Sequence, residues 1–86
     1  MMQITEHKKI RFNCRRGMLE LDMLLPELFD RQYVQLSAVQ QQKFIDLLAL
    51  PDPVVYGLIM GHEISDDSEL MALVRSLQAT IKTWRG

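Results

Sequence analysis

The C-terminal part of the chain carries a long, regular apolar stripe, and this stripe limits the folds that the chain can adopt. Large apolar side chains recur there every three or four residues, which is the spacing of one face of an α-helix. The stripe predicts a helix over residues 67–84 and comprises Leu70, Leu73, Val74, Leu77, Ile81 and Trp84. Such a helix needs partners that cover its apolar face. Since no β-strand pattern occurs elsewhere in the chain, those partners are expected to be helices.

Two helices are predicted in the first part of the chain. Residues 4–15 have a weak apolar pattern, so this helix is expected to be partly exposed. Residues 18–33 form the second helix, which should kink at Pro26 because proline cannot donate a backbone hydrogen bond. Its core stripe is predicted to be Met18, Leu21, Leu25, Leu28 and Phe29. Leu24, with Met23 close to it, falls on the charged face of the same helix and is expected to be exposed.

Capping residues delimit the third helix. Ser37 and Gln40 form a capping box, so this helix is expected to start at Ala38 and to end at Pro51. Its buried stripe is predicted to be Val39, Phe44, Leu47 and Leu48.

A short, almost wholly apolar fourth helix should follow and lie at the centre of the fold. Asp52 is predicted to cap it, and Gly61 to end it. Gly57 inside this helix indicates a close contact with another helix. Asp66 and Glu69 are predicted to cap the last helix.

The predicted architecture is all-α, a compact five-helix bundle. One domain is expected over residues 1–86, with its core at about residues 6–84, because a chain of 86 residues fills a single core. A single cysteine, Cys14, fits a reducing compartment. We find no membrane-spanning apolar run and no signal-peptide pattern, so a bacterial cytoplasmic protein without membrane insertion is expected.

The charge of the chain is small overall but unevenly distributed. The net charge is -1, made up of +4 over residues 1–16, -8 over residues 17–69 and +3 over residues 70–86. Such a split favours oriented docking on a charged partner, although the two ends could equally neutralise the middle. The acidic middle opposes a nucleic-acid-binding surface, so no nucleic acid is expected as a partner.

The sequence contains no arrangement of residues that indicates catalysis. No nucleophile, base and acid fall in related segments, and the four glycines are isolated rather than gathered in a phosphate-binding loop. His7 and Cys14 lie two helical turns apart, but no further metal ligand is near them, so a surface histidine and a half-buried thiol are the better interpretation. We therefore expect no enzyme activity and no metal site.

The most unusual segment runs from Arg15 to Asp22. Two arginines precede Gly17, and an acidic, apolar helix start follows it. One interpretation is a helix–helix corner, in which Gly17 takes a left-handed conformation, both arginines end one helix, and Glu20 and Asp22 begin the next. The other is a contact surface, because charges are dense beside large apolar side chains.

This segment also resembles a known family signature. The run from Cys14 to Asp22 is similar to that of the FAD assembly factors of succinate dehydrogenase, the SdhE family, with their Arg-Gly-x-x-Glu motif. The segments from Phe44 to Leu48, from Pro51 to Pro53, from Leu58 to Met60 and from Glu69 to Leu77 resemble the rest of the family pattern, over roughly residues 7–82. At Leu58 the family commonly has a tryptophan nearby.

The resemblance implies a helical assembly factor that is not an enzyme. It would bind the flavoprotein subunit of succinate dehydrogenase, or of fumarate reductase, as a monomer and promote covalent attachment of FAD to that subunit. It would hold no FAD stably itself. The resemblance implies that Arg16, Gly17 and Glu20 are the functional motif residues, with Arg15 and Asp22 flanking them. We expect these five residues to bind the partner, with Arg11, Met23, Leu24 and Asp52 as secondary contacts.

An alternative from another functional class stays open at this point. Relatives of this family have also been labelled as antitoxin components of toxin–antitoxin pairs. The motif residues Arg16, Gly17 and Glu20 do not distinguish such a binding module from an assembly factor.

Overall fold

The structure, a computed structural model, describes the backbone of residues 4–85 and the side chains of residues 6–83. The described chain forms five α-helices and one short 3₁₀ helix, and it contains no strand, so the all-α prediction is confirmed. The helices are α1 (Ile4–Phe12), α2 (Leu19–Gln32), the 3₁₀ helix η1 (Tyr33–Gln35), α3 (Ala38–Leu48), α4 (Asp52–Met60) and α5 (Ser68–Arg85). None of the described helices is both long and apolar enough to span a membrane.

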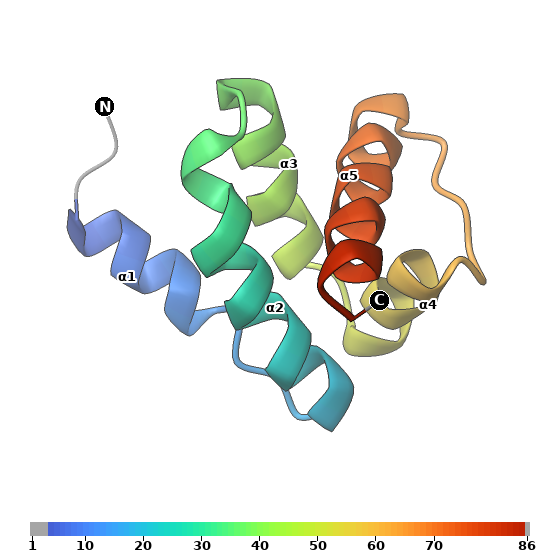
Figure 1. Cartoon of the computed structure of the whole chain (residues 1–86), viewed down its shortest axis with the longest axis horizontal. Helices are drawn as coiled ribbons and strands as arrows, with labels where there is room; N and C mark the ends of the chain where they lie inside the picture. Colours follow the sequence, from blue (N-terminus) through green and yellow to red (C-terminus); the bar gives the residue numbers. More distant parts are fainter. Residues whose placement is uncertain (1–3, 86) are drawn as a thin grey trace.

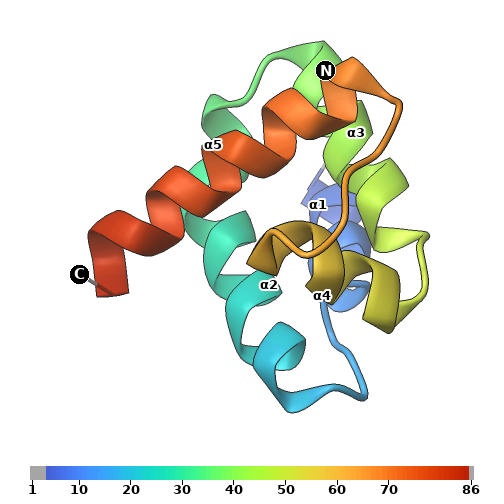
Figure 2. The same ribbon diagram turned by 90° about the vertical axis from the view of Figure 1, so that its right-hand side faces the viewer.

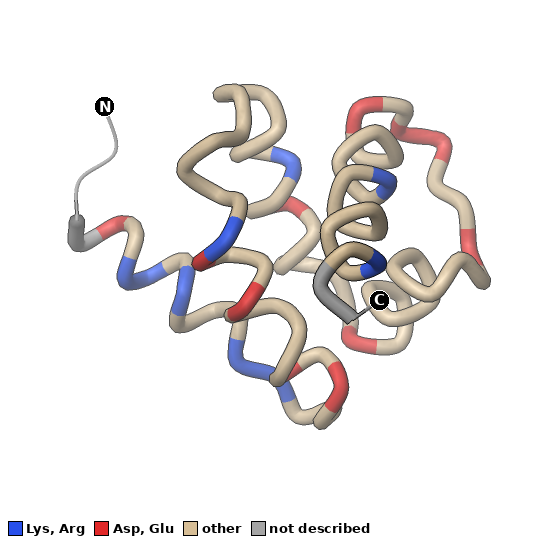
Figure 3. Tube along the Cα trace, viewed as in Figure 1, with Lys and Arg blue, Asp and Glu red and all other residues tan. Residues whose placement is uncertain are grey.

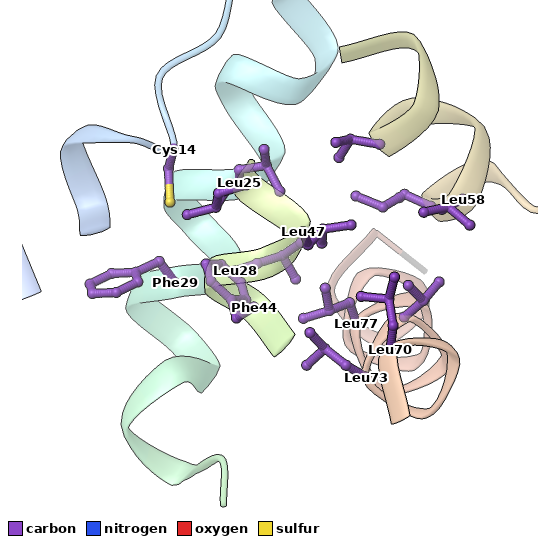
Figure 4. Close-up of a cluster of buried hydrophobic side chains, with 14 of the residues drawn as sticks. Cys14, Leu25, Leu28, Phe29, Phe44, Leu47, Leu58, Leu70, Leu73 and Leu77 are labelled. Carbon is purple, nitrogen blue, oxygen red and sulfur yellow. The ribbon is translucent and has the colours of Figure 1, made fainter. Parts of the chain in front are cut away.

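Helix α5 is the element against which most of the others pack. It contacts α2, α3 and α4, and Figures 1 and 2 show these helices arranged around it. Its predicted stripe is buried at Leu70, Leu73, Val74 and Leu77, half-buried at Ile81, and lies outside the described side chains at Trp84. Figure 4 shows these leucines facing side chains from α2, α3 and α4. Leu58, where the family commonly has a tryptophan nearby, is part of this core.

Helix α1 is attached to this core by a small part of its surface. Ile10, and Cys14 just after the helix, are buried in the core cluster, whereas most of the other described side chains of α1 are exposed, as predicted. His7 is half-buried rather than at the surface, because its ring packs edge-on against Phe29 and Tyr33. The Cys14 thiol is fully rather than half buried, and burial raises its pKa to about 12.

The predicted end of the first helix is wrong by a few residues. Helix α1 ends at Phe12 rather than at residue 15, because Asn13, Cys14 and Arg15 close the last turn with single backbone hydrogen bonds before the chain turns away. Helix α2 continues through Pro26 without a break. The capping box of Ser37 and Gln40 is confirmed.

Two predicted acidic caps differ in the structure. Asp67, not Asp66, caps α5, since its Oδ1 accepts hydrogen bonds from the backbone N–H groups of Glu69 and Leu70 at 3.1 Å each. The other carboxylate oxygen of Asp67 accepts a hydrogen bond from Nζ of Lys43 in α3 at 2.7 Å. Asp52 is the first residue of α4 rather than its cap, and its carboxylate turns toward the α1–α2 loop.

Two predictions of exposure and one of packing are also wrong. Val39 is 51% exposed, so it does not belong to the buried stripe of α3. Leu24 is buried rather than exposed on the charged face of α2. The space above Gly57 is filled by the Glu63 side chain from the following loop, not by another helix.

The glycines at positions 17 and 61 differ in a way that predicts different effects on stability. Gly61 ends α4 in the left-handed conformation, with φ of 82°, as expected for a helix end. Among the described residues it alone has a positive φ, so the left-handed conformation predicted for Gly17 is wrong. A Cβ atom at Gly17 would meet no other atom within 4 Å.

We predict that Gly61→Ala lowers the free energy of unfolding by about 1–2 kcal/mol, because alanine is strained at positive φ. Gly17→Ala should leave the free energy of unfolding unchanged or raise it by up to about 1 kcal/mol, because alanine fits at position 17 and makes the unfolded chain less flexible. Urea denaturation of both variants and the parent tests this. A loss of stability in Gly17→Ala as large as that in Gly61→Ala would contradict it.

Candidate functional site

The candidate site is the loop that joins α1 to α2, together with the first turn of α2. In both ribbon views this segment projects from the lower end of the molecule (Figures 1 and 2). The loop spans residues 13–18, and neither arginine of the motif lies in a helix. Both arginines instead bond to carboxylates, which hold the loop against the rest of the fold.

Asp22 holds the loop from the side of α2. Its Oδ1 accepts hydrogen bonds from the backbone N–H of Arg16 at 2.8 Å and from Nε of Arg15 at 3.0 Å. The backbone bond, followed by the bond from Arg15, lowers the pKa of the Asp22 carboxyl group. Asp22 is therefore engaged inside the molecule, whereas the Arg15 side chain remains 68% exposed.

Asp52 holds the loop from the opposite side, where α3 ends and α4 begins. Its Oδ1 accepts from Nη1 of Arg16 at 3.2 Å, and its Oδ2 accepts from the backbone N–H of Met18 at 3.3 Å. Nη2 of Arg16 donates to the carbonyl oxygen of Leu48, the last residue of α3. The Arg16 side chain is only 12% exposed, so it is largely an internal group.

The outer surface of this segment consists of residues that lack such internal bonds. Gly17 and Glu20 are exposed, and the Glu20 carboxylate forms no hydrogen bond or ion pair with the described residues. Leu19 and Met23, one helical turn apart, are 67% and 66% exposed. We call Gly17, Leu19, Glu20 and Met23 the motif face. It combines one unpaired charge with apolar side chains on a fixed backbone.

Two further predicted contact residues, Arg11 and Leu24, take part in internal contacts of the fold. Arg11 forms two bonds of 2.8 Å to Asp30 of α2, and this pairing lowers the pKa of Asp30. Arg11 thus joins α1 to α2 and remains half exposed. Leu24 is buried, so its side chain is not available on this surface as predicted.

Sequence reasoning did not identify Leu19 and Phe12 as surface residues. Phe12 is 74% exposed at the end of α1, where the loop begins. Leu19 could have been found from helical spacing, because it shares a face with Met23 and lies away from Leu21 and Leu25. No sequence signal identifies Phe12, since its exposure depends on the early end of α1.

A shallow groove lies beside the loop. It has a volume of about 160 Å³ and is lined by Ile10, Asn13, Ile45, Leu48 and Ala49. Sites for drug-sized ligands and cofactors usually measure about 300–1,000 Å³. This groove is therefore large enough for a side chain of a protein partner.

The charges around the site are mixed. Lys8 and Lys9 on α1 add positive charge near the loop, whereas Arg11 and the two loop arginines pair with aspartates. Away from the loop, the segment between α4 and α5 is acidic (Figure 3). The described residues contain no group of three or more side chains placed to hold a metal ion. The candidate site carries charged and apolar side chains, and its described residues include no nucleophile with an adjacent base.

The bonds to Asp22 predict a dependence of stability on pH. A lowered pKa in the folded state stabilises the fold above the unfolded-state pKa of about 3.9, and this contribution is lost as the pH falls through the folded-state pKa. Asp22→Asn should therefore be less stable than the parent at neutral pH, and the gap should close on acidification. Urea denaturation between about pH 7 and about pH 2 measures this gap. A gap that stays constant with pH would contradict the assignment.

Comparison with known proteins agrees with the resemblance of the motif. A family model described as "flavinator of succinate dehydrogenase" matches residues 8–81. A protein of Coxiella burnetii named FAD assembly factor SdhE is 41% identical over 71 residues, which cover 83% of this chain and 87% of the relative. Proteins with the same name from Shewanella oneidensis and Yersinia pseudotuberculosis are 41% and 38% identical, over 85% and 94% of this chain and 89% and 92% of their own lengths. The chain therefore belongs to the succinate dehydrogenase flavinator family, a family of assembly factors rather than of enzymes.

Proposed function

We propose that this protein binds the flavoprotein subunit of succinate dehydrogenase through the motif face and promotes covalent attachment of FAD to it. Family membership supports the reaction, because the relatives are named FAD assembly factors. The main observation that supports this location of the binding site is the unpaired Glu20 carboxylate. Of the three carboxylates at the loop, Asp22 and Asp52 bond internally and Glu20 alone is left for a partner.

The composition of the motif face supports a protein as the partner. Exposed Leu19 and Met23 supply apolar area beside the charge of Glu20, and Phe12 is a further exposed apolar side chain at the end of α1. Large apolar side chains gathered on an exposed surface are typical of protein–protein interaction sites. Gly17 adds no side chain, so a partner backbone can approach the loop closely there.

The protein would act by selecting a conformation of its partner. The factor supplies no reacting group of its own in this proposal, and FAD attachment proceeds within the flavoprotein subunit. Tighter binding to the conformation that is competent for attachment raises the population of that conformation. We propose that FAD is held by the partner rather than by this chain.

The direct test is a flavinylation assay with purified components. The apo flavoprotein subunit of succinate dehydrogenase is mixed with FAD, with and without this protein, and covalent flavin is measured by its fluorescence in a denaturing gel. We expect faster flavinylation with the protein present. The subunit of fumarate reductase is assayed in parallel as a second client. Equal rates with and without the protein would contradict the proposal, and capture of a toxin instead of a flavoprotein from lysate would favour the antitoxin alternative.

Glu20→Ala should abolish the effect on flavinylation while the protein stays folded. As an anion in the first turn of α2, Glu20 contributes only about 0.3–1 kcal/mol to stability. Removing a charge at a desolvated interface costs about 2–5 kcal/mol of affinity. The affinity for the flavoprotein subunit and the yield of covalent FAD measure the loss, and a thermal melt checks the fold.

Glu69→Ala is the matched control for this variant. Glu69 is the second residue of α5, as Glu20 is of α2, and it is also exposed. Glu27→Ala, which removes the partner of Arg31, is a second control on α2 itself. Both should support near-normal flavinylation. The proposal fails if Glu20→Ala behaves as these controls do.

Leu19→Ser and Met23→Ser should weaken binding of the flavoprotein subunit without destabilising the free protein. Both side chains are about two-thirds exposed, and polar replacements at such positions usually change stability by no more than about 0.5 kcal/mol. Val34→Ser is the control, since Val34 is 73% exposed but lies beyond the opposite end of α2 (Figure 1). Equal affinities of all three variants would exclude Leu19 and Met23 from the interface.

A further inference from the structure

We propose that Arg16 and Asp52 are positioning residues, which fix the loop so that Gly17 and Glu20 can meet the partner and do not bind the partner themselves. This inference rests on the proposed function. It divides the predicted contact residues into those that face the partner and those that hold them in place.

The guanidinium group of Arg16 points into the molecule. It reaches from the loop to the corner between α3 and α4, where Nη2 donates to Leu48 and Nη1 to Asp52. Both side chains are mostly covered, with 12% of Arg16 and 25% of Asp52 exposed. A guanidinium whose two terminal nitrogens both point inward has little surface left for another protein.

The electrostatics of the corner explain why an arginine and an aspartate meet there. Leu48 ends α3, and the carbonyl groups of a helix end lack partners and carry partial negative charge. Arg16 supplies both a donor and a positive charge to this end. Asp52 is the first residue of α4, where a carboxylate is favoured by the positive end of the helix. The ion pair therefore lies between two helix ends of opposite sign.

Asp52 fixes the loop on both sides of Gly17. One carboxylate oxygen bonds to the side chain of Arg16, and the other bonds to the backbone N–H of Met18. On the α2 side, Asp22 accepts from the backbone N–H of Arg16. The residues before and after Gly17 are thus bonded inward, and Gly17 is left facing outward with free space around its Cα atom.

The ion pair is not fully satisfied, which suggests a role beyond stability. Among the described residues, Nε of Arg16 is the single buried side-chain nitrogen or oxygen atom without a hydrogen-bond partner. A buried unpaired donor is destabilising. Departures of this kind gather at functional sites, where geometry rather than stability is the requirement.

The test is a double-mutant cycle of Arg16→Ala and Asp52→Ala, with affinity for the flavoprotein subunit as the readout. If the pair acts as one unit, each single variant binds roughly tenfold or more weakly, and the double variant binds no more weakly than the weaker single one. Saturating amounts of the variants should restore the full rate of flavinylation, since the contact residues are intact. Losses that multiply in the double variant would overturn the inference, because they indicate two independent partner contacts.

Arg15→Ala is the matched control for this cycle. Arg15 is the neighbouring loop arginine, and its guanidinium bonds to Asp22 rather than to Asp52. Its effect on affinity should therefore multiply with that of Asp52→Ala. A thermal melt accompanies each variant, and Arg16→Lys with Asp52→Asn gives the same cycle if an alanine variant is unfolded.

A second readout needs no partner and separates this inference from the proposed function. Amide hydrogen exchange of Met18 in the free protein should be faster in Asp52→Asn than in the parent, because the bond to its N–H is weakened. Glu20→Ala should leave this exchange unchanged. Unchanged exchange in Asp52→Asn would overturn the inference even if the protein binds the flavoprotein, whereas failure of the parent protein to bind would contradict only the proposed function.

Discussion

Burial of the apolar face of α5 is the interaction on which the rest of the fold depends. This helix contacts α2, α3 and α4, and each fully buried leucine contributes about 1.5–3 kcal/mol. The corner between α3 and α4 is set by this packing, and so is the place at which Asp52 can reach the α1–α2 loop.

The loop proposed to bind the partner is held in place by carboxylates that lie outside it. Loops are usually mobile, because they have few buried contacts. Here Asp22 and Asp52 accept hydrogen bonds from Arg15, Arg16 and Met18, and these bonds join the loop to α2 and to the start of α4. A loop ordered before binding loses less entropy when it meets a partner. Holding the loop in this way leaves Glu20 and its apolar neighbours presented on a defined surface.

This arrangement also gives a physical reason why two distant segments belong to one family pattern. The Arg-Gly-x-x-Glu motif and the Asp-Pro pair are separated by most of α2 and α3, yet Arg16 and Asp52 form an ion pair of 3.2 Å. Proline at position 53 fits the first turn of α4, where a missing N–H is tolerated. The aspartate before it is thereby held at the helix start, facing the loop.

The sequence by itself determined the helices, the capping box at Ser37, the glycine end of α4 and the apolar stripes, because these signals are local and repeat with the helical period. It also contained the motif by which the family is identified. Only the tertiary structure decided which charged groups pair. Asp67, not Asp66, caps α5 and also pairs with Lys43 of α3, and Leu24 is buried although it falls on a charged face. The sequence predicts Asp52 as a helix cap, but in the fold its carboxylate bonds to the loop. This pairing could not be predicted, because contacts between residues tens of positions apart leave no periodic signal in the sequence.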